Sequence, residues 1–357
     1  MNMSTLPMNK KNKKTKGQFY TTNSTYILEG LNPIPSNISF IIEPFAGNGD
    51  LINWLNDSGI KHEIKCYDIE PKKEYIIQQD TLKNPPDYDN SYVLTNPPFL
   101  ARNKCENKEI FDLYDTNDLY KCFLKSLTQS KKCKGGIIII PAGFFFSPRD
   151  IDVKCRNDFM SIYKILKVKY FEETVFNDTS TTIVVIQFEL HNEILIEQNI
   201  LWKFLPSGEE RIFHMKLEND WIIGGEIYKL QMPKNIKISR HVEGNELKNG
   251  EQQTFMTLNA LDSGTMVGRI SLSYKKDYIY PAKDCSRTYA TLRIIGKHLS
   301  EEDQKKICEK FNEFVEYKRQ ETWSLFLPQF RESKEYARKR IPFELAYKIV
   351  LNIIMNM

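Results

Sequence analysis

Short apolar runs alternate with helical stretches through the first half of the chain. Residues 115–130 place Leu119, Phe123 and Leu127 at the i, i+4, i+8 spacing of an amphipathic helix. Runs rich in β-branched residues predict strands, and the alternation is typical of an α/β domain with a largely parallel sheet. The predicted strands are residues 39–43, 63–67, 75–78, 92–95, 136–140, 165–170 and 183–189, enough for one wound sheet of seven strands.

The alternation stops near His191, and short irregular strands, polar turns and two terminal helices are predicted after it. The last helix, predicted at 334–354, has a basic start and then an apolar face that must pack against other residues. We therefore expect a flexible basic arm at residues 1–16, an α/β domain at 17–190, and a mixed α+β domain at 191–357.

Length and composition limit the class of protein. A chain of 357 residues with 41% hydrophobic residues can form two domains with real cores. The apolar run 137–140 is far too short to span a membrane, and the start lacks the apolar segment of a signal peptide. The seven cysteines form no Cys-x-x-Cys pair and the five histidines do not cluster with them, so no disulfide framework and no metal site is expected. These features predict a cytoplasmic protein without a membrane partner.

A glycine turn follows the first predicted strand. The segment Glu43-Pro44-Phe45-Ala46-Gly47-Asn48-Gly49 is a strand ending in an acid, then a Gly-x-Gly turn, with a helix expected near Asp50. Glycines let the backbone pass close to a ligand at the carboxyl end of a strand, where open α/β sheets bind ligands. A lone Gly-x-Gly is also an ordinary strand-to-helix turn.

Acidic residues end the next two predicted strands. Asp68 follows the second strand, where a carboxylate can accept both hydroxyls of a ribose, and Asp80 follows the third, where it can accept from an adenine amino group. Each acid alone could simply solvate a loop or cap a helix. Three acids at successive strand ends favour a cofactor that contains a nucleoside. The sequence has neither the Gly-x-Gly-x-x-Gly fingerprint that is typical of nicotinamide-binding proteins nor the Gly-Lys phosphate loop that is typical of nucleoside triphosphate-binding proteins.

The tetrapeptide Asn96-Pro97-Pro98-Phe99 follows the fourth predicted strand. The side-chain oxygen of Asn96 and the carbonyl of Pro97 can accept the two hydrogens of a planar amine and favour the pyramidal geometry that makes it nucleophilic. The prolines restrict the backbone that carries these acceptors, and Phe99 offers a face on which a displaced base can stack. A Pro-Pro turn closing a strand over a buried Phe is the structural alternative.

With these motifs the chain resembles the gamma-ordered, amino-methylating (N6-adenine) DNA methyltransferases of restriction-modification systems, over roughly residues 17–189. The resemblance implies a Rossmann-like, seven-stranded S-adenosylmethionine-dependent methyltransferase domain followed by a C-terminal target-recognition domain. It implies an adenine-specific enzyme that acts on a flipped-out base of double-stranded DNA, with a companion restriction endonuclease possible. It implies cofactor contacts by Tyr20, Thr21, Glu43, Ala46, Gly47, Gly49, Asp68, Ile69, Asp80 and Asn96.

The resemblance also implies a second stacking residue, Phe176, in a loop before an alternating strand, where a core role is equally consistent. In the second half, cations and aromatics mix over residues 269–293, which suits contacts with phosphates and base edges but also suits a solvated loop. The candidate DNA-binding residues there are Arg269, Lys275, Lys276 and Arg287. The polar stretch 100–116 is expected to be a mobile loop that becomes ordered over DNA.

The same tetrapeptide chemistry would serve cytosine N4 in DNA, adenine in RNA or a glutamine amide in a protein, since each is a planar nitrogen that needs two acceptors. A non-catalytic DNA-binding protein on an inactive methyltransferase fold is a further alternative, which the intact tetrapeptide and acids disfavour.

Overall fold

The computed structural model describes residues 21, 23–176, 181–242, 244–262, 269–281, 287–327, 329–330 and 338–357, with the backbone alone at 329–330. The chain divides into two compact units. The first comprises Met1–Phe145 and Arg149–Trp221, and the second Phe146–Pro148 and Ile222–Met357. Among the described helices, none combines the length and apolar character needed to cross a bilayer.

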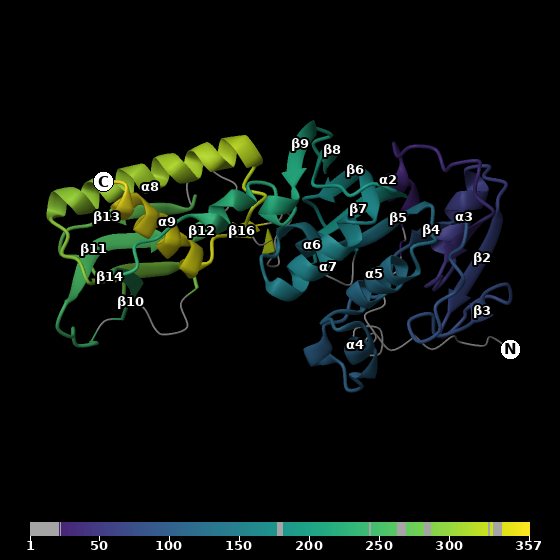
Figure 1. Cartoon of the computed structure of the whole chain (residues 1–357), viewed down its shortest axis with the longest axis horizontal. Helices are drawn as coiled ribbons and strands as arrows, with labels where there is room; N and C mark the ends of the chain where they lie inside the picture. Colours follow the sequence, from purple (N-terminus) through teal and green to yellow (C-terminus); the bar gives the residue numbers. More distant parts are fainter. Residues whose placement is uncertain are drawn as a thin grey trace, which may run out of the picture. The chain divides into compact units, whose positions relative to one another are not determined.

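The first unit is a mixed α/β structure on a large, mostly parallel sheet. Its strands run in the order β3-β2-β1-β4-β5-β7-β6-β8-β9, from β3 at one edge to β9 at the other (Figure 1). Parallel pairing joins β3, β2, β1, β4 and β5, whereas β7 lies antiparallel to both β5 and β6. The strands are β1 (Phe40–Glu43), β2 (Glu63–Asp68), β3 (Ile77–Gln78), β4 (Ser91–Thr95), β5 (Gly135–Pro141), β6 (Tyr163–Phe171), β7 (Ile183–Leu190), β8 (Glu197–Leu205) and β9 (Glu210–Lys216).

A strand lies in each of the seven predicted ranges, but the sheet continues beyond them. Strands β8 and β9 extend it past His191, and the first unit runs to Trp221, so the domain boundary expected at residue 190 lies further along the chain. The alternation does not stop there, since Ile200, Trp202 and Phe204 of β8 are all fully buried. Strand β8 joins β6 in parallel, which gives those side chains the sheet's core to pack against.

Most helices of the first unit lie between its strands along the chain. The amphipathic face predicted around Phe123 and Leu127 is confirmed, because both side chains are buried. The predicted helix 115–130 is shorter, however: Asp115 ends α4 in a left-handed conformation, and α5 begins at Leu119. The helices are α2 (Ser24–Leu28), α3 (Asp50–Asp57), η1 (Arg102–Lys104), α4 (Glu109–Tyr114), α5 (Leu119–Ser130), α6 (Gly143–Phe146), α7 (Asp150–Met160) and η2 (Leu217–Asn219).

The second unit is built on a four-stranded antiparallel sheet of order β10-β14-β11-β13. Its strands are β10 (Lys237–His241), β11 (Glu251–Asn259), β13 (Ser271–Tyr274) and β14 (Tyr289–Ile295). A smaller sheet has the order β12-β16-β15, formed by β12 (Leu261–Asp262), β15 (Gln329–Phe330) and β16 (Arg338–Arg340). With η3 (Gly225–Lys229), helices α8 (Glu301–Thr322) and α9 (Phe343–Met355) share one apolar core with the four-stranded sheet.

The last helix starts later than predicted. Residues 338–340, expected to form its basic first turn, are strand β16, paired with β12, and α9 begins at Phe343. Pro342 disfavours helical geometry for the residue before it, so the helix cannot extend backwards through Ile341. The apolar face does pack as expected, because Ala346, Ile349 and Val350 are buried in the core of the second unit.

Candidate functional site

The site lies at the carboxyl ends of the parallel strands. Strand β1 ends in Glu43, β2 ends in Asp68, and β4 ends in Thr95, directly before Asn96. These three strands are neighbours and run in the same direction, so their last residues meet at one edge of the sheet. This edge is where open α/β sheets bind ligands.

The glycine turn after β1 has a left-handed backbone at both glycines. Gly47 has φ of 51° and Gly49 has φ of 83°, in the left-handed region. Gly49 also precedes α3 as its N-cap, and a Cβ there would lie 2.4 Å from the hydroxyl oxygen of Tyr75. The turn therefore keeps a bare backbone at the strand ends.

Asp68 fixes that turn in place. Its Oδ2 accepts a hydrogen bond of 2.8 Å from the main-chain N–H of Gly47, and its Oδ1 accepts one of 2.8 Å from Glu70. The residue is only 7% exposed, yet it lines the cavity described below. Each carboxylate oxygen has lone pairs left over, so Asp68 can position the glycine turn and accept from a ligand as well.

Glu43 is a buried acid behind the turn. It is 1% exposed, and its Oε1 accepts hydrogen bonds from Thr95 Oγ1 (2.5 Å) and from the main-chain N–H of Phe45 (3.1 Å). Burial raises the pKa of Glu43 to about 8, against the opposing effect of these two hydrogen bonds. Glu43 is not among the residues that line the cavity. Its hydrogen bond with Thr95 instead joins the end of β1 to the end of β4.

Asp80 lies in the loop after β3. Its Oδ1 is 3.2 Å from the main-chain nitrogens of both Leu82 and Lys83, which donate to it. Asp80 also lines the cavity. Its other carboxylate oxygen, Oδ2, can therefore accept a hydrogen bond from a ligand there.

A cavity of about 430 Å³ joins these elements. This volume lies within the range of roughly 300–1,000 Å³ typical of small-molecule sites. Of the residues predicted to bind a cofactor, Gly47, Asp68, Ile69, Asp80 and Asn96 line it. The prediction missed the apolar and polar remainder of the lining: Phe45, Glu70, Gln79, Thr81, Leu82, Lys83, Leu100, Cys105, Asn107, Ile110 and Leu119.

The tetrapeptide reaches the same cavity. Asn96 and Pro98 line it, and Pro97 between them is buried. The Asn96 amide nitrogen Nδ2 donates a hydrogen bond of 3.1 Å to Thr21 Oγ1, and Thr21 is itself buried. The amide is thereby oriented from a segment that lies 75 residues away in sequence.

Phe99 occupies a different position from the one expected. Its ring is 9% exposed, meets the ring of Tyr120 edge-on with centroids 6.2 Å apart, and is not among the cavity-lining residues. Phe176 is likewise buried, 4% exposed, at the end of a described segment. In this structure neither ring presents an open face, so stacking of a base on either one requires a rearrangement.

The stretch after the tetrapeptide is more ordered than expected. Residues 100–116 contain η1 and α4, and Phe111 and Tyr114 of α4 are buried. Asp118 holds the start of this stretch, because its Oδ1 accepts from the main-chain N–H of Leu100 at 3.1 Å, and burial raises its pKa to about 6. The helical spacing of Phe111 and Tyr114 is the sequence signal that could have revealed a packed segment.

The remaining predicted residues lie elsewhere. Tyr20 falls outside the described residues, and Ala46 is buried beneath the turn. The four candidate DNA-binding residues belong to the second unit. Arg269 pairs with Glu316 at 2.9 Å, Lys276 pairs with Glu301 at 3.2 Å, the Lys275 ammonium lies 5.1 Å from the ring centroid of Tyr278, and Arg287 is exposed.

No protein-family model matches the chain, and no curated protein matches it. A modification subunit assigned to a type I restriction enzyme of Vibrio vulnificus is 15% identical, with a TM-score of 0.42 over 54% of this chain and 48% of that one. The methyltransferase subunit of a type I restriction-modification system from Streptococcus thermophilus is 15% identical, with a TM-score of 0.39 over 54% and 49%. The M protein of the type I restriction enzyme EcoKI is 16% identical, with a TM-score of 0.36 over 48% and 45%.

The chain thus spans about half the length of each of these solved structures.

Proposed function

We propose that this protein is an S-adenosylmethionine-dependent methyltransferase that modifies the exocyclic amino group (N6) of adenine in double-stranded DNA. The observation that carries the proposal is that Asn96 of the tetrapeptide lines the same cavity as Gly47, Asp68 and Asp80. Asn96, which could activate a planar amine, would therefore act beside three residues that are suited to binding a nucleoside. The recognition of a specific DNA sequence, and a companion endonuclease acting on the same site, belong to the same proposal.

The residues at the strand ends fit the proposed cofactor. Gly47 presents backbone without a side chain to the cavity, and Asp68 and Asp80 would supply acceptors for ribose hydroxyls and an adenine amino group. Phe45, Ile69 and Leu82 supply apolar surface for a purine ring. When bound, S-adenosylmethionine would supply an electrophilic methyl group that needs no further activation.

Asn96 and Pro97 would act on the target amine. The Asn96 side-chain oxygen and the Pro97 carbonyl are the two acceptors that would hold its hydrogens and turn its lone pair towards the methyl group. Because Thr21 Oγ1 accepts from Asn96 Nδ2, the amide oxygen is directed to the opposite side, away from Thr21. The buried Pro97 limits reorganisation of the backbone, which keeps the two acceptors at a fixed separation.

The test is methyl transfer from labelled S-adenosylmethionine to duplex DNA, with tRNA and protein as parallel substrates. We expect label in DNA as N6-methyladenine. Label as N4-methylcytosine, in tRNA or in protein would replace the proposed substrate with one of the alternatives, and the absence of transfer to any substrate would overturn the proposal.

A matched pair of variants tests the role of the tetrapeptide. Asn96→Ala should reduce the transfer rate by about 100-fold or more, because one of two preorganised acceptors is lost. Its affinity for the cofactor should change little, as measured by calorimetry. Asn56→Ala, at an exposed position of α3, should transfer at the normal rate. Normal transfer by Asn96→Ala would contradict the assigned role.

A further inference from the structure

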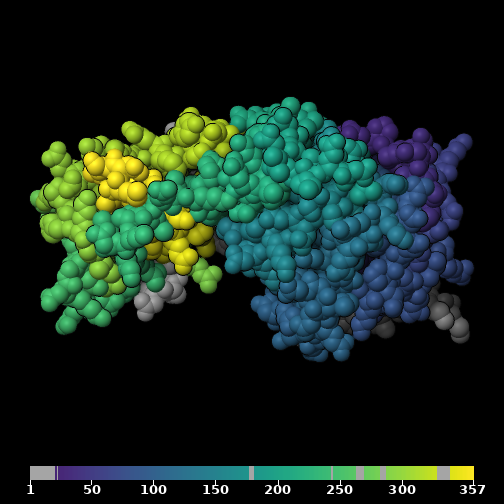
Figure 2. All heavy atoms as spheres, viewed as in Figure 1, coloured from purple at the N-terminus to yellow at the C-terminus, as the bar shows by residue number. Residues whose placement is uncertain are grey.

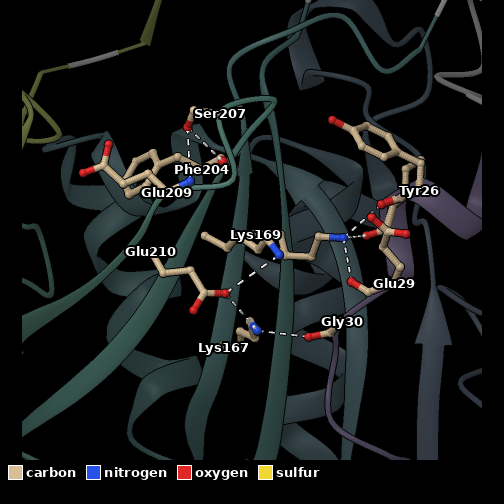
Figure 3. A network of polar contacts seen from close by, with 11 residues as sticks. Tyr26, Glu29, Gly30, Lys167, Lys169, Phe204, Ser207, Glu209 and Glu210 are labelled. Carbon is tan, nitrogen blue, oxygen red and sulfur yellow. Dashed lines mark hydrogen bonds and ion pairs between the residues drawn. The ribbon is translucent and has the colours of Figure 1, made fainter.

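A buried lysine on β6 joins the N-terminal segment to the sheet. Lys169 is 1% exposed, and its ammonium donates to the main-chain carbonyl oxygens of Tyr26 (2.9 Å), Ile27 (2.8 Å) and Glu29 (2.9 Å). Figure 3 shows the side chain of Lys169 directed at this group of carbonyls at the end of α2. The proposed chemistry uses neither the lysine nor these carbonyls.

The arrangement satisfies both partners. The last carbonyls of a helix have no intrahelical donor and carry partial negative charge, and α2 has no basic residue of its own in its last turn. An ammonium has three N–H donors and no acceptor, which matches the three carbonyls. Burial lowers the pKa of Lys169 to about 8, while the charge of Glu29 opposes that shift, so the group is mainly an ammonium at neutral pH.

Strand β6 and its neighbour β7 hold the same segment at further points. Lys167 Nζ donates to the Gly30 carbonyl at 3.0 Å (Figure 3). The Gln187 side chain of β7 both accepts from the N–H of Asn32 (2.8 Å) and donates to its carbonyl (3.0 Å). Figure 2 shows the purple N-terminal residues lying against the teal residues of the later strands, although the two are far apart in sequence. The segment is thus fixed by side chains of the sheet.

The fixed segment leads into the site. Thr21 lies just before Asn23, the N-cap of α2, and is the residue that accepts from Asn96 Nδ2 at 3.1 Å. The position of Thr21 therefore depends on where α2 is held. The buried side chains Ile27 and Leu28 and the contacts of Tyr26 with Phe171 and Glu173 hold the short helix along its length. Lys169 adds three hydrogen bonds at its end.

We propose that Lys169 is a positioning residue, which holds the end of α2 so that Thr21 orients the Asn96 amide. This inference rests on the proposed function for its activity readout. It makes the fold of the N-terminal segment part of the site: a change at Lys169 lowers the rate of methyl transfer through Thr21 and Asn96 without touching the cavity.

Amide hydrogen exchange on the full chain tests the structural half of the proposal without any activity. Lys169→Met keeps the length of the side chain and removes the donors. We expect exchange across residues 23–32 to become at least about tenfold faster, because hydrogen bonds from a charged donor are lost. Lys203→Met is the control, since Lys203 lies on the adjacent β8 and pairs with Glu210 at 3.9 Å. Unchanged exchange in Lys169→Met would overturn the proposal.

A double-mutant cycle tests the functional half, with the rate of methyl transfer from labelled S-adenosylmethionine to duplex DNA as the readout. Thr21→Val should lower this rate in the parent protein and have little further effect in Lys169→Met, because the segment is already displaced. If the two substitutions lower the rate independently of each other, Lys169 does not act through Thr21 and the assignment is refuted. If the parent protein transfers no methyl group, the proposed function fails, while the exchange experiment still decides whether Lys169 holds α2.

A second variant keeps the proposal testable if Lys169→Met does not fold. Lys167 is partly exposed and donates to Gly30 in the same segment, so Lys167→Met leaves the core intact. It should speed exchange in residues 23–32 and lower the rate of methyl transfer, both by less than Lys169→Met does. If Lys167→Met leaves both unchanged, the segment is not held from the sheet in the way proposed.

Discussion

The buried acid Glu43 makes the stability of the first unit depend on pH in a predictable direction. Burial raises its pKa from 4.5 to about 8, and the negative charge of Asp68 adds to that shift. Between these two values the folded protein holds a proton on Glu43 that the unfolded chain has lost. The folded state therefore binds more protons in this range, and its stability falls as pH rises.

The size of the effect follows from the shift. Each pH unit between 4.5 and 8 should lower the free energy of unfolding by about 1.4 kcal/mol, for a total on the order of 5 kcal/mol. Glu43→Gln removes the ionisation and keeps a carbonyl-type oxygen that can accept from Thr95 and Phe45. The variant should therefore gain stability relative to the parent as pH rises from 5 to 8, and the difference should level off above about pH 8.

Urea unfolding at pH 5, 6, 7 and 8, followed by tryptophan fluorescence, measures this difference. Trp54, Trp202 and Trp221 belong to the first unit, so they report mainly on it. Glu63→Gln is the control, because Glu63 is exposed at the start of β2 and should leave the pH dependence unchanged. Parallel stability curves for Glu43→Gln and the parent would refute the reasoning, because they would mean that Glu43 ionises normally in the folded protein.

Two further substitutions test the packing of each unit by the same unfolding measurement. In the first unit, a Cβ on Gly136 would lie 2.5 Å from the carbonyl oxygen of Val93, so Gly136→Ala should destabilise by about 1–3 kcal/mol or more, whereas Gly143→Ala, with no atom within 4 Å, should not destabilise. Equal stabilities of the two variants would contradict the strand packing. In the second unit, Ser300 forms a capping box with Asp303 at the start of α8, and Ser300→Ala should cost about 1 kcal/mol; no loss would mean that the cap does not form.

Local features of the site could be predicted from sequence because they are encoded by neighbouring residues. The apolar runs fixed where the strands lie, and the residues that follow them fixed which side chains reach the carboxyl edge. Gly47, Asp68, Asp80 and Asn96 line one cavity. That parallel strands bring these residues together follows from the α/β pattern alone.

Contacts between distant segments could not be predicted in this way. The sequence does not reveal that Phe99 packs against Tyr120 and away from the cavity, or that Ile110 of α4 lines the cavity. Whether an aromatic ring faces a ligand or a neighbouring helix depends on which side chains fill the space around it.

The sequence by itself determined the α/β class of the first unit, the positions of seven strands of its sheet and which residues stand at the strand ends, because periodicity and turn residues act over a few positions. Only the tertiary structure decided that β8 and β9 extend the sheet, and that Lys169 holds the carbonyl of Tyr26 across 143 residues of chain. Such contacts form when separate elements bury their apolar faces together, and the pairing of those faces is a property of the whole fold rather than of any local pattern.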